Sequence, residues 1–169
     1  DSLVYPLNMS HTTAAAHLGT HTAACGLCWY QGDIFVCEPT GQLVTRTQIT
    51  PDGAAFRATR IRTQPQTEFL RSRDEWFRPV NLRTGPDGAL YVCDMYRRFI
   101  DHSRFFPDEF SQAHYMSAGF DQGRIWRITP SSSSHQKRVK KNDVNRAKRV
   151  YQMDLPSLVS EFRNASPEV

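Results

Sequence analysis

Charged side chains stand at the two ends of a β-rich segment in the middle of the chain. Arg78 lies at the start of one predicted strand, and Asp94 and Arg97 directly follow the next. An arginine fork binds a carboxylate or a sugar hydroxyl in two-point geometry, and an aspartate orients such a ligand or binds calcium. We therefore predict that Arg78, Asp94 and Arg97 bind a cofactor. The competing interpretation is structural, with an Asp94–Arg97 or Asp74–Arg78 ion pair fixing strand to loop.

A second group of candidates combines an acid–base pair with aromatic rings. His102 follows Asp101, and a histidine held by a neighbouring carboxylate acts as a base near neutral pH or as a metal ligand. We predict that His102 and Asp101 are catalytic. Trp76 and Tyr96 could form a platform on which a sugar stacks, so we predict that they bind substrate. Packing within the sheet is the other interpretation of both rings.

The four cysteines leave several interpretations open. Cys25 and Cys28 have the spacing of a zinc half-site or a redox pair, but Trp29 follows where haem attachment needs histidine, so the chain contains no haem site. Cys37 and Cys93 fall within predicted strands, where cysteine usually serves as a small buried hydrophobe. Buried thiols, a disulfide that involves Cys25 or Cys28, and a metal site all remain open as interpretations. We assign no metal ligand.

The elements that position these residues are short strands joined by turns. The sequence Pro-Asp-Gly at 86–88 predicts a hairpin turn. Segment 33–38 matches 89–94 in the order aromatic, valine, cysteine and carboxylate, and 123–128 is a shorter echo. Repetition on this scale favours a radial array of strands. Because one blade takes roughly 40 to 50 residues, we predict a mainly β fold, a partial β-propeller of about two to three blades.

A change in composition marks the predicted domain boundary. Residues 1–130 form the partial propeller, 131–141 a basic serine-rich linker, and 142–169 a helical segment with one apolar stripe that opens a helical-repeat region. The net charge of +4 is concentrated in the linker and just beyond it. No aromatic residues interleave these basic ones, so we expect a solvated linker and no nucleic-acid binding.

Four phrases of this sequence carry a resemblance to a known family. They occupy 75–81, 85–92, 94–97 and 121–128, and the matched region runs from about Thr22 to Thr129. They resemble the propeller of the membrane-bound dehydrogenase family of planctomycetes and verrucomicrobia. In that family a propeller similar to soluble pyrroloquinoline-quinone sugar dehydrogenases precedes HEAT-type helical repeats, and often a c-type cytochrome domain.

The resemblance implies a function for the complete protein. It implies an exported oxidoreductase, periplasmic or at the cell surface, that uses pyrroloquinoline quinone and calcium to dehydrogenate a sugar or alcohol and passes electrons to a cytochrome c domain. We interpret this chain as an internal fragment that is inactive alone, whose partners are the remaining blades and helical repeats. The alternative is a non-catalytic propeller scaffold that binds polysaccharide or protein.

Overall fold

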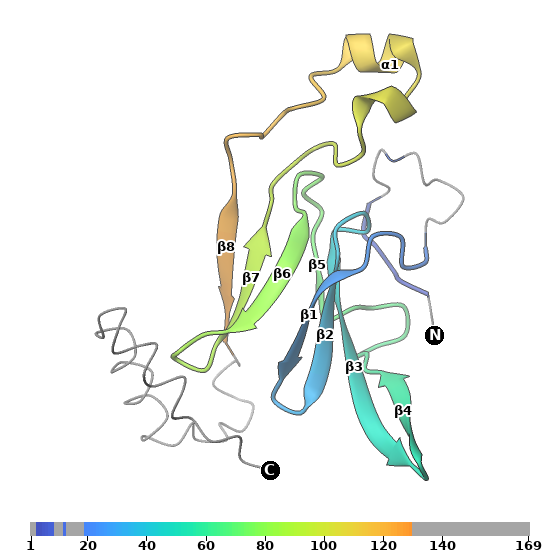
Figure 1. Ribbon diagram of the computed structural model, residues 1–169, viewed down its shortest axis with the longest axis vertical. Helices are drawn as coiled ribbons and strands as arrows, with labels where there is room; N and C mark the ends of the chain where they lie inside the picture. The colour runs from blue at the N-terminus through green and yellow to red at the C-terminus, as the bar shows by residue number, and fades with distance from the viewer. Residues whose placement is uncertain (1–2, 9–11, 13–18, 130–169) are drawn as a thin grey trace. The chain divides into compact units, whose positions relative to one another are not determined.

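The computed structural model describes residues 3–8, 12 and 19–129 (Figure 1). Contacts divide the chain into two units, Asp1–Thr84 with Leu90–Ile128, and Gly85–Ala89 with Thr129–Val169. Both β-sheets belong to the first unit. The predicted linker and helical segment lie outside the described residues. No helix in the described part of the chain is long and apolar enough to cross a membrane.

The first sheet is an antiparallel meander in the order β1-β2-β3-β4, with a short fifth strand, β5, paired to the start of β3. The β1–β2 hairpin has a two-residue loop, Gln31-Gly32, in which both residues have positive φ. That is the turn whose twist matches the strands it joins. The strands are β1 (Cys25–Tyr30), β2 (Asp33–Glu38), β3 (Leu43–Asp52), β4 (Ala55–Arg60) and β5 (Leu70–Arg71).

The second sheet contains three antiparallel strands in the order β6-β7-β8. The hairpin predicted at Pro-Asp-Gly is confirmed, because Thr84 and Leu90 pair on either side of it. A long insertion separates β7 from β8 and extends beyond the end of β7 (Figure 1). The elements are β6 (Pro79–Thr84), β7 (Leu90–Asp94), the 3-10 helix η2 (Ser103–Phe105), α1 (Asp108–Ala113) and β8 (Arg124–Ile128).

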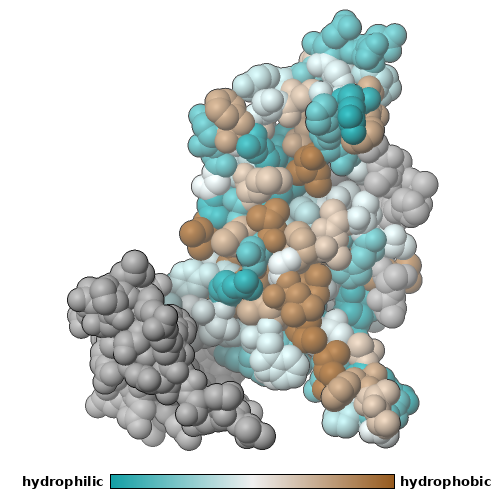
Figure 2. Space-filling model, in the orientation of Figure 1, coloured by the Kyte–Doolittle hydropathy of each residue, from teal (hydrophilic) through white to brown (hydrophobic). Residues whose placement is uncertain are grey.

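The core lies where β1 and β2 pack against β6 and β7. One cluster of buried side chains joins the two sheets, and it consists of Cys28, Tyr30, Phe35, Cys37, Val44, Leu82, Leu90 and Val92. Hydrophobic side chains also reach the surface, including Trp29, Phe56 and Ile125, and Figure 2 shows a band of them on one face. Strands that are covered on one face by the partner sheet therefore still carry apolar residues on the other.

The middle strands β2 and β7, which match in sequence, bury opposite faces. Phe35 and Cys37 are buried in β2, whereas Leu90 and Val92 are buried in β7, and Tyr91, the counterpart of Phe35, is only half-buried. Successive residues of a strand point to opposite faces, so the burial pattern is shifted by one residue. Two stacked copies of one unit have this relation, as consecutive propeller blades do. The predicted fold class, mainly β and built as a partial propeller, is confirmed by these two stacked antiparallel sheets.

Candidate functional site

Arg78 is buried, with 1% of its surface exposed, and its guanidinium group donates hydrogen bonds to backbone carbonyls. Nε donates to the carbonyl of Arg97 (2.8 Å), one terminal nitrogen donates to Pro39 (2.9 Å) and Thr40 (3.5 Å), and the other donates to Arg98 (2.6 Å). These carbonyls belong to the turn after β2 and the loop after β7. Burial lowers the pKa of Arg78 to about 10, which leaves the group protonated at neutral pH. The geometry favours a clamp between the sheets over a cofactor ligand.

Asp94 accepts four hydrogen bonds while only 3% exposed. Oδ1 accepts from the backbone N–H groups of Arg78 (2.8 Å) and Tyr96 (3.0 Å). Oδ2 accepts from Nε of Arg124 (3.3 Å) and Nε1 of Trp126 (3.0 Å). A carboxylate offers about four lone-pair sites, so these donors occupy its whole capacity. This arrangement supports the structural interpretation of Asp94.

Glu38 has the same task at the matching position of the first sheet. Its buried carboxylate accepts from the backbone N–H groups of Thr22 (3.0 Å) and Ala23 (3.1 Å), just before β1. Asp94 accepts from Arg78, just before β6. The carboxylate that recurs in the sequence therefore ties the end of a middle strand to the start of its neighbour. Burying a charge in this way is tolerable because backbone donors surround it.

Arg124, which sequence reasoning missed, organises the predicted aromatic platform. Its guanidinium carbon lies 3.6 Å from the ring centroid of Tyr96 and 5.0 Å from that of Trp126. The same group donates to Asp74 (3.0 Å). Trp76 packs on Tyr96 with ring centroids 5.5 Å apart and the planes tilted by 37°. Trp76 and Tyr96 thus lie together, and the ring of Tyr96 contacts Arg124 in a cation–π arrangement that accounts for packing.

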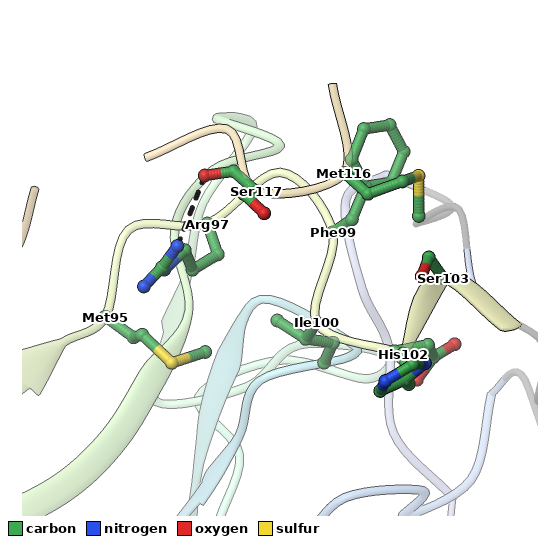
Figure 3. Close-up of a pocket in the computed structure, with 9 residues that line it drawn as sticks. Met95, Arg97, Phe99, Ile100, His102, Ser103, Met116 and Ser117 are labelled. Atoms are coloured by element: carbon green, nitrogen blue, oxygen red, sulfur yellow. Dashed lines mark hydrogen bonds between the residues drawn. The ribbon is translucent and has the colours of Figure 1, made fainter. Parts of the chain in front are cut away.

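A pocket of about 340 Å³ opens in the loop that follows β7 (Figure 3). Its volume lies at the lower end of the range for small-molecule sites. Three predicted residues, Arg97, Asp101 and His102, line it, whereas Arg78, Asp94 and the two aromatic residues do not. The remaining lining residues, which the sequence did not indicate, are Met95, Phe99, Ile100, Ser103, Met116 and Ser117.

Aromatic packing within the insertion supports the wall of this pocket. Phe99 is buried, and its ring centroid lies 5.7 Å from that of Phe110 and 6.2 Å from that of Phe106. Phe110 in turn stacks on His114, with centroids 4.1 Å apart. Edge-to-face and offset contacts of this kind stabilise beyond the area they bury. They hold α1 against the segment that carries Asp101 and His102.

The polar lining groups already have protein partners. The guanidinium of Arg97 donates to the carbonyls of Ser117 (3.3 Å, dashed in Figure 3) and Phe120 (3.1 Å). Asp101 accepts from the hydroxyl of Thr12 (2.9 Å). Nδ1 of His102 accepts from the backbone N–H of Arg104 (3.1 Å) at the start of η2. In this tautomer Nε2 carries the proton and is a hydrogen-bond donor. His102 can therefore act as a base only if its hydrogen bond from Arg104 breaks.

The pocket lining does not by itself supply the cations that pyrroloquinoline quinone would need. Among the described residues, no group of three histidine, cysteine, aspartate or glutamate side chains could hold a metal ion. A quinone with three carboxylates needs several cationic side chains around it. Arg97 is the one arginine among the pocket's lining residues, and its guanidinium already donates to two backbone carbonyls. The cofactor, substrate and catalytic roles predicted from the sequence all stay predictions, and the pocket brings Arg97, Asp101 and His102 together.

Comparisons with known proteins assign the family. The solved structure of a candidate oxidoreductase (glucose dehydrogenase) from Thermus thermophilus is similar at a TM-score of 0.41 and 22% sequence identity, covering 63% of this chain and 25% of that chain. This chain thus spans about a quarter of that protein. A comparison with curated proteins gave no match. The model of the family described as "Domain of unknown function (DUF7133)" matches residues 1–132, which is most of the chain, and the chain therefore belongs to this family.

Proposed function

We propose that this chain is part of a propeller oxidoreductase and that the pocket after β7 binds its substrate, a sugar or another alcohol. The observation that carries the proposal is the convergence of Arg97, Asp101 and His102 on one pocket of about 340 Å³. Sequence phrases that resemble the membrane-bound dehydrogenase family support the reaction class. A periplasmic or cell-surface location belongs to the same proposal.

The lining of the pocket suits a polyhydroxylated molecule. Asp101 provides a carboxylate acceptor for substrate hydroxyls, and His102 presents an Nε2–H donor in the tautomer fixed by its bond to Arg104. Met95 and Ile100 supply an apolar wall for the carbon face of a ring. Sites of this kind combine many apolar contacts with a few well-placed polar groups.

The proton chemistry follows from the geometry of His102. To accept a proton from a substrate hydroxyl, Nε2 must be unprotonated, so the proton has to move to Nδ1 and the bond from Arg104 must be lost. Binding of the substrate would have to drive that rearrangement of η2. The hydride acceptor is not assigned to the described residues; in the complete protein a quinone would supply it.

A binding protein without catalysis is the second candidate, and the same histidine favours it. The hydrogen bond at Nδ1 leaves His102 as a donor, which is suited to holding a hydroxyl rather than deprotonating it. A polysaccharide or a protein loop would then occupy the pocket. The two candidates share a ligand site and differ in the ligand and in turnover.

Substitution at the pocket tests the proposal. In the full-length protein, Asp101→Asn should weaken sugar or alcohol binding, measured by titration calorimetry, by about tenfold or more, since a hydrogen bond to a charged group contributes roughly 1.5–3 kcal/mol. His102→Gln should weaken it by about two- to tenfold, since a hydrogen bond between neutral groups contributes roughly 0.5–1.5 kcal/mol. Glu109→Gln, an exposed change in α1 outside the pocket lining, serves as the matched control.

Dye reduction by the full-length protein with added quinone and calcium separates the two candidates. Turnover of a sugar or alcohol that His102→Gln abolishes supports the oxidoreductase. Binding that the pocket variants weaken, without turnover, supports the binding protein. If the Asp101→Asn and Glu109→Gln variants bound each ligand of the unsubstituted protein with equal affinity, the pocket would be excluded as the binding site.

A further inference from the structure

The cysteine residues of the two sheets form a group that the pocket does not use. Cys37 is fully buried, Cys28 is nearly so, and Cys25 packs against the same core cluster while remaining partly exposed. Burial raises the pKa of Cys37, and the charges of Cys25, Cys93 and Cys28 raise it further, in that order. All four cysteines are free in this structure.

The sheet register selects one pair from this group. Cys25 of β1 and Cys37 of β2 are direct partners across an antiparallel ladder. Residues in such positions point to the same face, with Cα atoms about 4.5–5.5 Å apart, and a disulfide needs a Cα separation of about 4.4–6.8 Å. The spacing that the backbone already provides is thus the spacing that a disulfide requires.

The other pairings are disfavoured by the same geometry. Cys28 pairs with Phe35, so it stands diagonally from Cys37, at about 7–8 Å in a regular sheet. Cys25 and Cys28 lie on either side of a bulge and face residues two apart in β2, Cys37 and Phe35, so their separation is about 6.4–6.8 Å, at the upper end of the disulfide range. Cys93 follows Val92, whose side chain is in the core, so Cys93 points to the opposite face of β7. The C-x-x-C spacing in the sequence therefore does not define the bond.

A bulge in β1 gives access to the pair. The ladder shifts between Cys25 and Cys28, and Gly26 within the bulge has φ of +59°. A Cβ at Gly26 would lie 2.6 Å from Cα of Asn81 and from the carbonyl oxygen of Val80, so the bulge packs directly on β6. Cys25 lies at the edge of this contact and is reached from solvent more easily than Cys37.

We propose that Cys25 and Cys37 form a cross-strand disulfide when the protein meets a small-molecule disulfide oxidant. The thiolate of Cys25 attacks one sulfur of the oxidant, forms a mixed disulfide and releases one thiol. The thiolate of Cys37 then attacks the sulfur of Cys25 and releases the second thiol. Two protein thiols are oxidised, one oxidant disulfide is reduced to two thiols, and the two thiol protons pass to them.

Peptide mapping of the oxidised full chain tests the proposal directly. The protein is incubated with oxidised glutathione, its remaining thiols are alkylated, and it is cleaved on the amino side of aspartate. This cleavage places Cys25 and Cys28 in peptide 1–32, Cys37 in 33–51 and Cys93 in 87–93. We expect peptides 1–32 and 33–51 to be joined, and the number of alkylated thiols to fall from four to two.

Two serine variants assign the bond within peptide 1–32. Cys25→Ser should abolish the link to 33–51, whereas Cys28→Ser, three residues away, should retain it. An internal bond in 1–32, a link to 87–93, a link lost in Cys28→Ser and retained in Cys25→Ser, or four alkylated thiols after oxidation would each overturn the proposal. The result with the unsubstituted chain stands even where a variant fails to fold.

Discussion

At the scale of single residues, the charged side chains that stand out in the sequence divide into two groups. Arg78, Asp94 and Glu38 are buried, and their polar atoms bond to the backbone or to neighbouring side chains. Arg78 connects the two sheets, whereas Asp94 and Glu38 each tie neighbouring strands of one sheet. Asp101 and His102 line a pocket instead. The sequence gives only the residue types and does not distinguish the two groups. An arginine that donates to backbone carbonyls and an arginine that binds a ligand have the same side chain, and only their surroundings in the fold differ.

The clamp role of Arg78 makes a sharp prediction for stability. Arg78→Lys should destabilise the chain by about 3 kcal/mol or more, since one ammonium cannot reach carbonyls in both loops, and each buried carbonyl left unpaired costs about 1–3 kcal/mol. Urea unfolding monitored by tryptophan fluorescence measures the loss. The matched control is Arg83→Lys at an exposed site, which should change stability by less than about 0.5 kcal/mol. Equal midpoints for the two variants would refute the clamp.

At the scale of elements, the turns and strands were predicted more successfully than the site. The Pro-Asp-Gly hairpin and the middle strands have local signals, namely turn residues and β-branched or aromatic runs, and both are present in the structure. The position of Arg124 against Tyr96 and Asp74 has no such signal, because these residues are far apart in sequence and meet only when β8 pairs with β7. The pocket residues Met116 and Ser117 were missed for the same reason.

The bulge in β1 allows a prediction at this scale. Gly26 and Gly32 both have positive φ, but only Gly26 has backbone atoms within 4 Å of where a Cβ would lie. Gly32→Ala should cost about 1–2 kcal/mol for the left-handed conformation alone. Gly26→Ala should cost roughly 1–3 kcal/mol more, because β1 must move away from β6. Guanidinium unfolding of the two variants compares them, and equal losses would mean that the sheets do not meet closely at Gly26.

At the scale of the whole molecule, the shifted burial of β2 and β7 distinguishes two ways of joining sheets. If two matching sheets were related as the halves of a symmetric sandwich, matching residues would face the core together. In stacked copies, the face that one sheet packs into the core corresponds to the face that the other sheet points away from the core. Phe35 is buried while its counterpart Tyr91 is half-buried, as stacking requires. The repeat in the sequence indicated the copies, but only the packing reveals how they face each other.

Lysine substitution along the two strands tests this relation. A lysine at Phe35 or Val92 places a charge in the core and should prevent folding or cost several kcal/mol, since its ammonium has no partner there. A lysine at the half-buried Ile34 or Tyr91 can extend its head to water and should leave a folded chain. Circular dichroism and urea unfolding of the four variants give the pattern. Stacking predicts sensitivity at positions that do not match in the repeat, Phe35 and Val92, whereas a symmetric sandwich predicts it at the matching pair Phe35 and Tyr91.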